Sequence, residues 1–429
     1  MTLRLATSDK DFANAFDRLV RGRRESDIEV SRDVTAIIAD VKARGDAALI
    51  EYTSRFDGHS LAGGGWSIGK DACAAAYAAL SDKLRTALDL AASRIRAYHQ
   101  AQLPENRDYT DAAGVRLGAR WTAVDAAGLY VPGGRAAYPS SLLMNAIPAK
   151  VAGVERLVVV TPTPKGVINP LVLAAAHLAG VDEIWRIGGA QAVAALAYGT
   201  ETIRAVDVVT GPGNAWVAEA KRQLYGVVGI DMVAGPSEIV VVSDAKSDPE
   251  WIAADLLSQS EHDPTSQSIL FTDDAGFADI VADTVGVQLA QLSTEKVATK
   301  AWETNGAIIV VDSLEDAMPL VNRLAAEHLE LAVDDPEALF AKVKHAGSVF
   351  MGRLTPEAVG DYVAGPNHVL PTGRRARFSS GLSVLDFMKR TSFIELGREG
   401  LLAIGPAAVA LAEMEGLPAH ADSVKRRLT

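Results

Sequence analysis

Short apolar runs alternate with helical stretches from about residue 126 onward. In the first part of this region, the runs 128–131, 156–160, 183–187 and 206–209 have the length and composition of buried strands. Helical stretches at about 169–178, 192–198 and 215–224 separate or follow them. Because strands that alternate with helices form βαβ units, the pattern predicts a parallel sheet with helices on its faces. We expect a Rossmann-like domain over residues 126–237.

The same alternation continues over residues 238–380. Strand patterns occur at 238–242, 268–271, 307–311 and 348–351, with helical patterns at 249–258, 275–292 and 314–326. We expect a second α/β domain here. The two halves have similar lengths, which raises the hypothesis of a duplication, although no residue-level repeat supports it.

Helical patterns occupy both ends of the chain. Apolar residues at three-to-four spacing, such as Val34, Ile37 and Val41, predict helices over most of residues 1–100. Beyond about residue 380 the chain turns helical again and ends in a short tail that carries Glu415 and His420. The predicted fold is therefore α/β, with two Rossmann-like parallel-sheet domains of similar size, a helical N-terminal region over 1–125 and a small helical C-terminal tail over 381–429. A polar tail of this kind often reaches a neighbouring domain or subunit.

Composition places the chain among globular proteins. Of its 429 residues, 48% are hydrophobic and 22% are charged, which fits two or more buried cores. The apolar runs are too short for a secretory signal peptide or a membrane span. The single cysteine, Cys73, allows neither an intrachain disulfide nor a thiolate metal cluster. Together these features predict a cytoplasmic protein.

The acidic balance of the chain argues against nucleic acid as its main partner. The formal net charge is −12, whereas binding to phosphates needs a basic face. Short basic clusters do occur, at 21–24, 374–377 and 425–427. We interpret each of them as solvated or as part of a subunit contact.

Three glycine-containing loops follow predicted strands. They are Pro132-Gly133-Gly134, Gly188-Gly189-Ala190-Gln191 and Gly211-Pro212-Gly213-Asn214. In parallel sheets, ligands bind where strands end and helices begin, because free backbone N–H groups and the positive helix end point there. The loops therefore favour a nucleotide or anion site. None of them is the GxGxxG fingerprint, and the alternative is that the glycines only turn the chain.

Gln259 and His262 begin a candidate metal site. They stand three residues apart at the end of a helical pattern, so a continuing helix would place both side chains on one face. Zinc needs three or four protein ligands. Asp361, in a glycine-rich loop, and His420, in the tail, would complete a set of two nitrogens and two oxygens, but spacing alone does not bring the four together. The alternative is a polar, solvated helix end.

Glu327 and His328 form a candidate pair for proton transfer. An imidazole has an unperturbed pKa near ~6.5 and can act as a base at neutral pH. The pair follows the helical pattern 314–326. The alternative is a solvated helix C-terminus, where the helix dipole favours a cationic histidine.

A series of longer motifs resembles those of the histidinol dehydrogenases, in the order in which that family has them. The motifs are Gly188-Gly189-Ala190-Gln191-Ala192, Gly211-Pro212-Gly213-Asn214-Ala215, Asp231-Met232, Ala234-Gly235-Pro236-Ser237-Glu238, Gln259-Ser260-Glu261-His262-Asp263, Ala326-Glu327-His328-Leu329-Glu330 and Gly365-Pro366-Asn367-His368-Val369-Leu370-Pro371-Thr372. Several long motifs in one order are far more specific than any single motif. The helical N-terminal region adds little to the resemblance.

The resemblance implies a zinc-dependent enzyme of histidine biosynthesis that oxidises L-histidinol through L-histidinal to L-histidine with two NAD⁺. It implies one Zn²⁺ per subunit, held by Gln259, His262, Asp361 and His420. It implies that His420 comes from the partner subunit of a homodimer with shared active sites. The implied NAD contacts are Tyr130, Gln191 and Asn214. The implied substrate contacts are Ser237, Gln259, His262, Glu327, His328, Asp361, Glu415 and His420.

The resemblance also assigns the catalytic roles. His328 would remove the alcohol proton as hydride leaves, and Glu327 would activate the water that hydrates the aldehyde. Three other functions stay open at this point. A relative on the same scaffold would oxidise a different alcohol, a zinc hydrolase would turn over without nicotinamide, and a ligand-binding protein would bind without turnover. Glu357, Glu415 and the Asn367-His368 pair suit a cationic substrate, so we favour histidinol.

Overall fold

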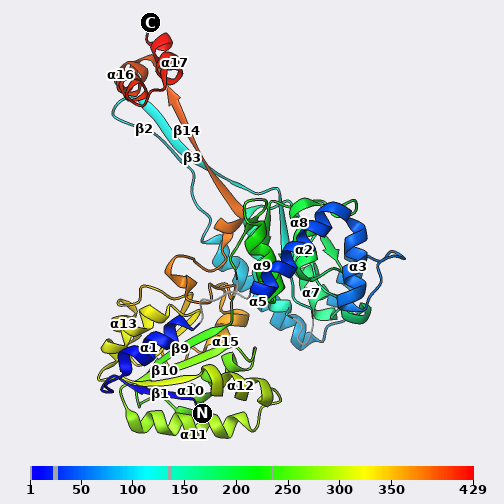
Figure 1. Cartoon of the computed structure of the whole chain (residues 1–429), viewed down its shortest axis with the longest axis vertical. Coiled ribbons are helices and arrows are strands. Elements are labelled where there is room, and N and C mark those ends of the chain that lie inside the picture. Colours follow the sequence, from blue (N-terminus) through cyan, green and yellow to red (C-terminus); the bar gives the residue numbers. More distant parts are fainter. Residues whose placement is uncertain (1, 23–27, 134–137, 234) are drawn as a thin grey trace.

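A computed structural model describes residues 2–22, 28–133, 138–233 and 235–429. Two units built on parallel sheets lie side by side, and a long arm projects away from them (Figure 1). The expected α/β fold with two parallel sheets is therefore confirmed. Among the described residues, no helix is both long and apolar enough to cross a lipid bilayer.

The first sheet has five parallel strands in the order β6-β5-β4-β7-β8. Its strands are β4 (Ala126–Tyr130), β5 (Arg156–Val160), β6 (Glu183–Trp185), β7 (Val208–Thr210) and β8 (Gly229–Ile230). Its helices are α2 (Ile28–Arg44), α3 (Asp46–Asp57), α4 (Lys70–Ala78), α5 (Asp82–Gln100), α6 (Pro139–Ala152), α7 (Pro170–Ala179), α8 (Gly189–Tyr198) and α9 (Ala215–Leu224).

Both faces of this sheet are covered. Alternate residues of β5 point to opposite faces, so Leu157 packs into a core with α4 to α7, while Val158 packs into a core with α2, α3, α8 and α9. Burial on both faces explains why the strands appear in the sequence as continuous apolar runs rather than as alternating patterns.

The second sheet has six parallel strands in the order β1-β11-β10-β9-β12-β13. They are β1 (Leu3–Ala6), β9 (Glu238–Ser243), β10 (Gln267–Thr272), β11 (Ala307–Val310), β12 (His328–Ala332) and β13 (Ser348–Met351). The helices α1 (Phe12–Arg21), α13 (Leu314–Leu324) and α14 (Pro336–Phe340) pack on one face, and α10 (Pro249–Ser260), α11 (Ala275–Leu289) and α12 (Glu295–Asn305) on the other.

The two sheets share one strand order. Taken along the chain, β4 to β8 lie in the order third, second, first, fourth, fifth, and β9 to β13 lie in the same order. This is the order of dinucleotide-binding sheets, in which the direction of winding reverses between the first and fourth strands. The shared topology favours the duplication hypothesis at the level of strand order.

The first residues of the chain differ from the predicted helical region. Strand β1 pairs in parallel with β11, and Phe16 of α1 is buried in the core of the second sheet. The prediction of helix was wrong for residues 3–6 because a four-residue edge strand leaves too short a pattern, and its partner lies about 300 residues away. The division of the chain at 125, 237 and 380 stays a prediction.

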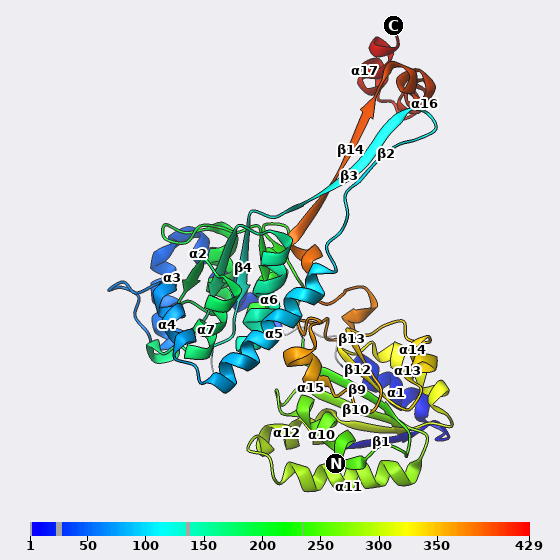
Figure 2. The same cartoon turned by 180° about the vertical axis from the view of Figure 1, so that it is seen from behind.

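The structure also has an antiparallel arm that the sequence pattern did not predict. Strands β2 (Arg107–Thr110), β3 (Val115–Ala123) and β14 (Met388–Leu396) form a three-stranded sheet in the order β14-β3-β2. It carries α16 (Arg398–Met414) and α17 (Pro418–Leu428) at its tip, far from both parallel sheets (Figures 1 and 2). The predicted tail helices are present, but they begin only after β14.

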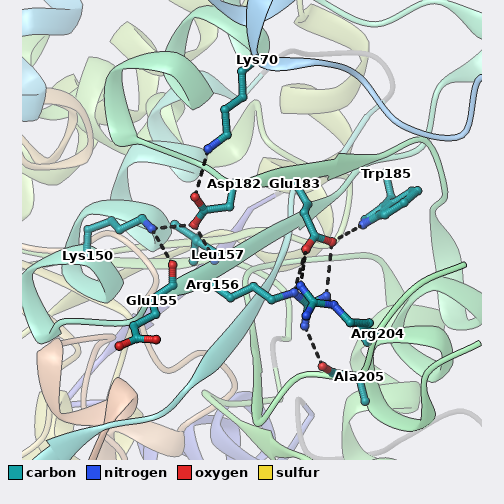
Figure 3. A network of polar contacts seen from close by, with 10 residues as sticks. All are labelled: Lys70, Lys150, Glu155, Arg156, Leu157, Asp182, Glu183, Trp185, Arg204 and Ala205. Carbon is teal, nitrogen blue, oxygen red and sulfur yellow. Dashed lines mark hydrogen bonds and ion pairs between the residues drawn. The ribbon is translucent and has the colours of Figure 1, made fainter.

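A network of ion pairs ties the helices to the first sheet (Figure 3). Asp182 accepts hydrogen bonds from Lys150 Nζ (2.7 Å), Lys70 Nζ (3.2 Å) and the backbone N–H of Leu157 (3.0 Å). The neighbouring Glu183 pairs with Arg156 at 2.7 Å. These residues lie at the amino ends of β5 and β6, so the network stabilises the edge of the sheet opposite to the glycine loops.

Candidate active site

A cavity of about 270 Å³ lies between the two parallel-sheet units. Its lining from the first unit is Pro132, Tyr138, Ser140, Ser141, Pro212, Gly213 and Asn214, and from the second unit Ser237, Gln259, His262, Glu327, His328, Asp361, Tyr362 and His368. The first sheet contributes the loops at the carboxyl ends of its strands. The second contributes its amino ends, because Glu327 and His328 lie at the start of β12 and Ser237 directly precedes β9.

Glu327 and His328 do not lie at a solvated helix end, and that alternative was wrong. Helix α13 ends at Leu324, Ala325 adopts a left-handed conformation (φ 46°), and His328 is the first residue of β12. Strand β12 lies between β9 and β13, so Glu327 is only 7% exposed and His328 only 3%. The local sequence pattern did not predict this strand.

The backbone of one residue, Glu238, contacts both side chains. The backbone N–H of Glu238 donates to Glu327 Oε2 at 3.0 Å. The backbone carbonyl of Glu238 lies 3.3 Å from His328 Nδ1, and since a carbonyl only accepts, this nitrogen carries the proton. The other ring nitrogen, Nε2, lies 3.5 Å from Glu357 Oε1 and 3.4 Å from Asp361 Oδ1. The imidazole thus presents Nε2 to the carboxylates that surround it.

The pKa values of the pair reflect this crowding. Burial raises the pKa of the Glu327 carboxyl to about 8, against the opposing effect of His328. Burial alone would lower the pKa of His328, but the charges of Glu357, Glu327 and Asp361 outweigh it and raise the pKa to about 10. The site therefore favours positive charge at its centre, either on the imidazole or on a bound cation.

Glu357 is fixed by a second layer of polar groups. The hydroxyl of Ser258 donates to Glu357 Oε2 at 2.8 Å, and the backbone N–H of Glu357 donates to Glu330 Oε1 at 2.7 Å. Burial and the nearby carboxyl of Asp255 raise the pKa of Glu330, and burial raises the pKa of Asp255 to about 6. Glu357 was expected to suit a cationic substrate, but it was not among the predicted ligands or bases. The structure adds its place beside His328 and Asp361.

Gln259 and His262 reach the cavity from the end of α10. Gln259 lies in the last turn of the helix, and its buried Oε1 has no hydrogen-bond partner among the residues that the structure describes. His262 lies just beyond the helix end and is exposed on the cavity wall. Buried polar atoms normally have a hydrogen-bond partner. A buried amide oxygen beside carboxylates and without such a partner therefore fits the role of a metal ligand.

Asp361 is held by its neighbour His368. It lies in a short π-helical turn, Gly360–Ala364, which follows α15 (Glu357–Val359), a backbone form frequent at functional sites. His368 Nδ1 donates to the backbone carbonyl of Asp361 at 2.8 Å. His368 was expected near the substrate, and the structure adds a role as a support of Asp361.

The donor set fits zinc. His328, Glu357 and Asp361 offer ligand atoms that all lie within 4.8 Å of one another, and Gln259 and His262 line the same cavity. These nitrogen and oxygen donors suit zinc. This geometric set shares only Asp361 with the ligands implied by the resemblance.

The predicted NAD contacts cluster on the first sheet. Tyr130 ends β4, and its hydroxyl accepts a hydrogen bond from the N–H of Gly189 at 3.0 Å. Gly189 has a φ of 67° and an added Cβ would lie 2.6 Å from Gln191 Oε1, so this close turn requires glycine. Asn214 caps α9 by accepting from Val217 N–H at 3.1 Å and lines the cavity.

A buried ion pair supports the loop before Asn214. Lys221 pairs with Asp231, and both side chains are almost completely buried. Lys221 Nζ donates to the carbonyl of Gly211 at 3.0 Å, and Asp231 Oδ2 accepts from the N–H of Gly211 at 2.8 Å. The loop is thus held in place from both sides. Of the third predicted loop, Gly134 lies outside the described residues.

Four predicted site residues do not line the cavity of their own chain: Tyr130 and Gln191, which are buried in the first unit, and Glu415 and His420. Glu415 follows α16 and His420 lies in α17, at the tip of the arm (Figure 2). Neither is among the described residues that line the cavity. Ser141 and Tyr138 line it without having been predicted, because isolated serine and tyrosine residues carry no sequence signal of function.

The sequence model of the histidinol dehydrogenase family matches residues 20–428. The chain belongs to the histidinol dehydrogenase family. It is 66% identical over 428 residues to a histidinol dehydrogenase of Zymomonas mobilis, covering 100% of both chains. It is 62% identical to that of Rhodospirillum rubrum over 429 residues, covering 100% of this chain and 99% of the relative.

A solved structure supports the same assignment. The crystal structure of histidinol dehydrogenase from Elizabethkingia anophelis has a TM-score of 0.94 and 37% sequence identity, covering 100% of this chain and 98% of that one. The resemblance seen in the motifs is therefore confirmed over the whole chain, including the N-terminal helices. The family consists of NAD-dependent oxidoreductases that perform the last two oxidations of histidine biosynthesis.

Proposed function

We propose that this protein oxidises L-histidinol through L-histidinal to L-histidine, using two NAD⁺ and a zinc ion in each active site. One observation carries the proposal. In a chain of the histidinol dehydrogenase family, the two candidate bases Glu327 and His328 line the same cavity as Gln259, His262 and Asp361. The loop that ends in Asn214 lines the opposite wall, where the nicotinamide would approach.

Gln259, His262 and Asp361 would hold the zinc, with His420 of a second subunit as the fourth ligand. The unpartnered Oε1 of Gln259 and the carboxylate of Asp361 support this set. When bound, zinc would anchor the imidazole and amine of the substrate and polarise its reacting oxygen. A positive charge beside Asp361 would also offset the carboxylates around His328 and lower the imidazole pKa toward the range of a base.

His328 serves as the base of the hydride steps. Its Nδ1 proton is held by the Glu238 carbonyl, so a neutral imidazole has its lone pair on Nε2, on the side of the carboxylates. In the first oxidation, the alcohol O–H proton goes to Nε2 while the carbon-bound hydrogen leaves with its electron pair to NAD⁺. The carbon–oxygen bond becomes the carbonyl of the aldehyde.

Glu327 serves the hydration step. Its carboxylate takes one proton from a water molecule, and the remaining hydroxide forms a bond to the aldehyde carbon. The proton that His328 took in the first oxidation goes to the former carbonyl oxygen, which gives the hydrate and leaves His328 neutral again. A pKa of about 8 makes it a stronger base than an ordinary carboxylate. The hydrate then loses a second hydride to another NAD⁺ and a proton to His328, which yields the carboxylic acid.

The arm supports a homodimer with shared active sites. Its helix α16 exposes large apolar side chains, among them Leu411 at 64% and Met414 at 87%. Exposed apolar side chains that gather on a projecting element are typical of a subunit contact. A second subunit that covers them could bring Glu415 and His420 to the cavity of its partner.

One assay tests the reaction. The purified, zinc-loaded protein is given L-histidinol and NAD⁺, and NADH formed is compared with histidinol consumed. We expect two NADH per histidinol. NADH from other alcohols but none from histidinol would instead indicate a relative with a different substrate. Turnover without NADH would indicate a hydrolase, and binding without turnover a ligand-binding protein.

A further inference from the structure

We propose that Arg374 is a positioning residue for catalysis: its buried ion pair with Glu238 fixes the residue whose backbone N–H and carbonyl orient Glu327 and His328. The proposal rests on the roles given above to Glu327 and His328. It concerns a residue of the basic cluster 374–377, which the sequence analysis interpreted as solvated or as a subunit contact. For Arg374 the solvated interpretation was wrong, because the residue is only 2% exposed.

Arg374 reaches the start of two neighbouring strands. Its Nη1 lies 3.1 Å from Glu238 Oε1, at the first residue of β9. Its Nη2 donates to Gln267 Oε1 at 2.6 Å, at the first residue of β10. The backbone N–H of Gln267 in turn donates to the carbonyl of Ser237 at 3.0 Å. A planar guanidinium can fix both partners at once, whereas a lysine ammonium offers no such rigid fork.

The segment that carries Arg374 is itself held on this edge of the sheet. Thr372 Oγ1 accepts from the backbone N–H of Gly235 at 2.5 Å. Arg374 adopts a left-handed backbone conformation, with φ 69°. Such a conformation is unfavourable for a side chain of this kind and persists where the surroundings impose it. The segment 372–374 therefore lies against the stretch 235–238, directly behind the wall of the cavity.

Glu238 connects Arg374 to Glu327 and His328. Its side chain is anchored by Arg374, its N–H donates to Glu327, and its carbonyl accepts from His328. Arg374, Glu238 and Gln267 are not among the described residues that line the cavity. Arg374 therefore acts through the side chain and backbone of Glu238 and not on the substrate.

The same sheet offers a matched control. Arg353 bridges Asp244 (2.8 Å) and Asp334 (2.9 Å) and donates to the carbonyl of Ala332 at 2.8 Å. It thus joins β9 and β12, the strands that carry Glu238 and His328, at their opposite, carboxyl ends. Loss of either arginine removes a partly or fully buried ion-pair cluster from one sheet, but only Arg374 lies behind the catalytic pair.

The experiment compares Arg374→Gln with Arg353→Gln in zinc-loaded, full-length protein. We expect Arg374→Gln to lower kcat about 100-fold, the scale of a small misplacement of catalytic groups. Its zinc content and its KM for NAD⁺ should stay within about twofold of the parent protein, because the NAD loops lie on the other sheet. Arg353→Gln should lower the melting temperature and leave kcat within about twofold. A kcat of Arg374→Gln within twofold of the parent, or an equal loss in Arg353→Gln, would overturn the proposal.

Two further variants keep the test decisive. If Arg374→Gln does not fold, Arg374→Lys retains the buried charge and loses the fork, and we expect at least a tenfold loss of kcat in a folded protein. The double variant Arg374→Gln/Glu238→Gln should recover part of the kcat lost by Arg374→Gln alone, because no unpaired carboxylate is left buried. A fold-competent Arg374→Lys with unchanged kcat would contradict the proposal, as would a double variant no better than the single one.

His328→Asn separates this inference from the proposed function. If His328→Asn retains full kcat, the role proposed for the catalytic pair fails. If His328→Asn is inactive while Arg374→Gln is fully active, only the positioning role of Arg374 fails.

Discussion

The imidazole of His368 joins Ser141 of the first unit to Asp361 of the second. Its Nδ1 donates to the Asp361 carbonyl at 2.8 Å, and its Nε2 lies 3.1 Å from Ser141 Oγ. Burial lowers the pKa of His368, so the ring is neutral and its Nε2 accepts from the Ser141 hydroxyl. One ring thus couples the orientation of the proposed zinc ligand Asp361 to the packing of the two units against each other.

This relationship predicts that His368→Ala weakens zinc binding. Loss of a residue that orients a metal ligand typically costs about 10- to 100-fold in metal affinity. Competition with a chelator of known zinc affinity measures the change. Ser141→Ala is the matched control, since it removes only the hydroxyl contact and should weaken zinc less than His368→Ala does. Equal zinc affinity in His368→Ala and the parent protein would contradict the support role of His368.

His328→Asn separates a base from a ligand. As a base, His328 is expected to contribute about 10²- to 10⁴-fold to kcat, while the zinc content of the variant stays at that of the parent. Steady-state kinetics and metal analysis on the same preparation measure both. Loss of zinc together with activity would make His328 a ligand, in line with its closeness to Glu357 and Asp361, and would overturn the role as a base.

The raised pKa of Asp255 leads us to expect that the free energy of unfolding depends on pH. Its folded-state pKa is about 6, raised from 3.8 by burial, so the folded protein binds a proton that the unfolded chain releases at lower pH. The free energy of unfolding should therefore fall as the pH rises from about 4 through about 6, by up to ~3 kcal/mol at 1.36 kcal/mol per pKa unit.

Asp255→Asn should remove this part of the slope, because the amide stays neutral beside Glu330. Urea unfolding of the variant and the parent between pH 4 and 7 measures it. The exposed Asp283 of α11 provides the control variant Asp283→Asn. If the slopes of Asp255→Asn and the parent are the same, the buried proton is not at Asp255.

Asp182 predicts a stability effect without a catalytic one. It joins Lys150 of α6, Lys70 of α4 and the N–H of Leu157 in β5 (Figure 3). Asp182→Ala removes the carboxylate partner of a partly buried lysine and of a backbone amide and should cost about 1–3 kcal/mol. Because these contacts lie at the edge of the sheet opposite to the glycine loops, kcat should not change. A loss of kcat equal to that of a catalytic variant would show that this network reaches the site.

Because His420 lies on the arm, we expect dimer formation and zinc binding to depend on each other. Leu411→Glu places a charge on an exposed apolar surface of α16. We expect this variant to be monomeric by sedimentation and to lose zinc and activity, because His420 would no longer reach a partner subunit. Ile280→Glu changes an equally apolar, 53% exposed residue of α11 and should leave assembly intact. A dimeric Leu411→Glu, or a monomer with full zinc content, would contradict the shared active site.

The sequence by itself determined the local elements and the family. Strand β5, helix α9 and strand β13 have the predicted bounds, because each is a continuous local pattern buried within one sheet. The glycine loops lie at the carboxyl ends of their strands as expected, and Gln259, His262, Asp361 and the Glu327-His328 pair line one cavity. Residue types and their neighbours in the chain were sufficient for these predictions.

Only the tertiary structure decided which distant segments meet. Strand β1 pairs with β11, and β14 pairs with β3 across about 270 residues. The local sequence of one strand does not indicate which distant strand it pairs with. His328 begins a buried strand because β9 and β13 lie on either side of it. Arg374 is buried because Glu238 and Gln267 meet it at the edge of the second sheet. Burial and pairing depend on contacts between distant residues, whereas hydrophobic periodicity reports only on near neighbours.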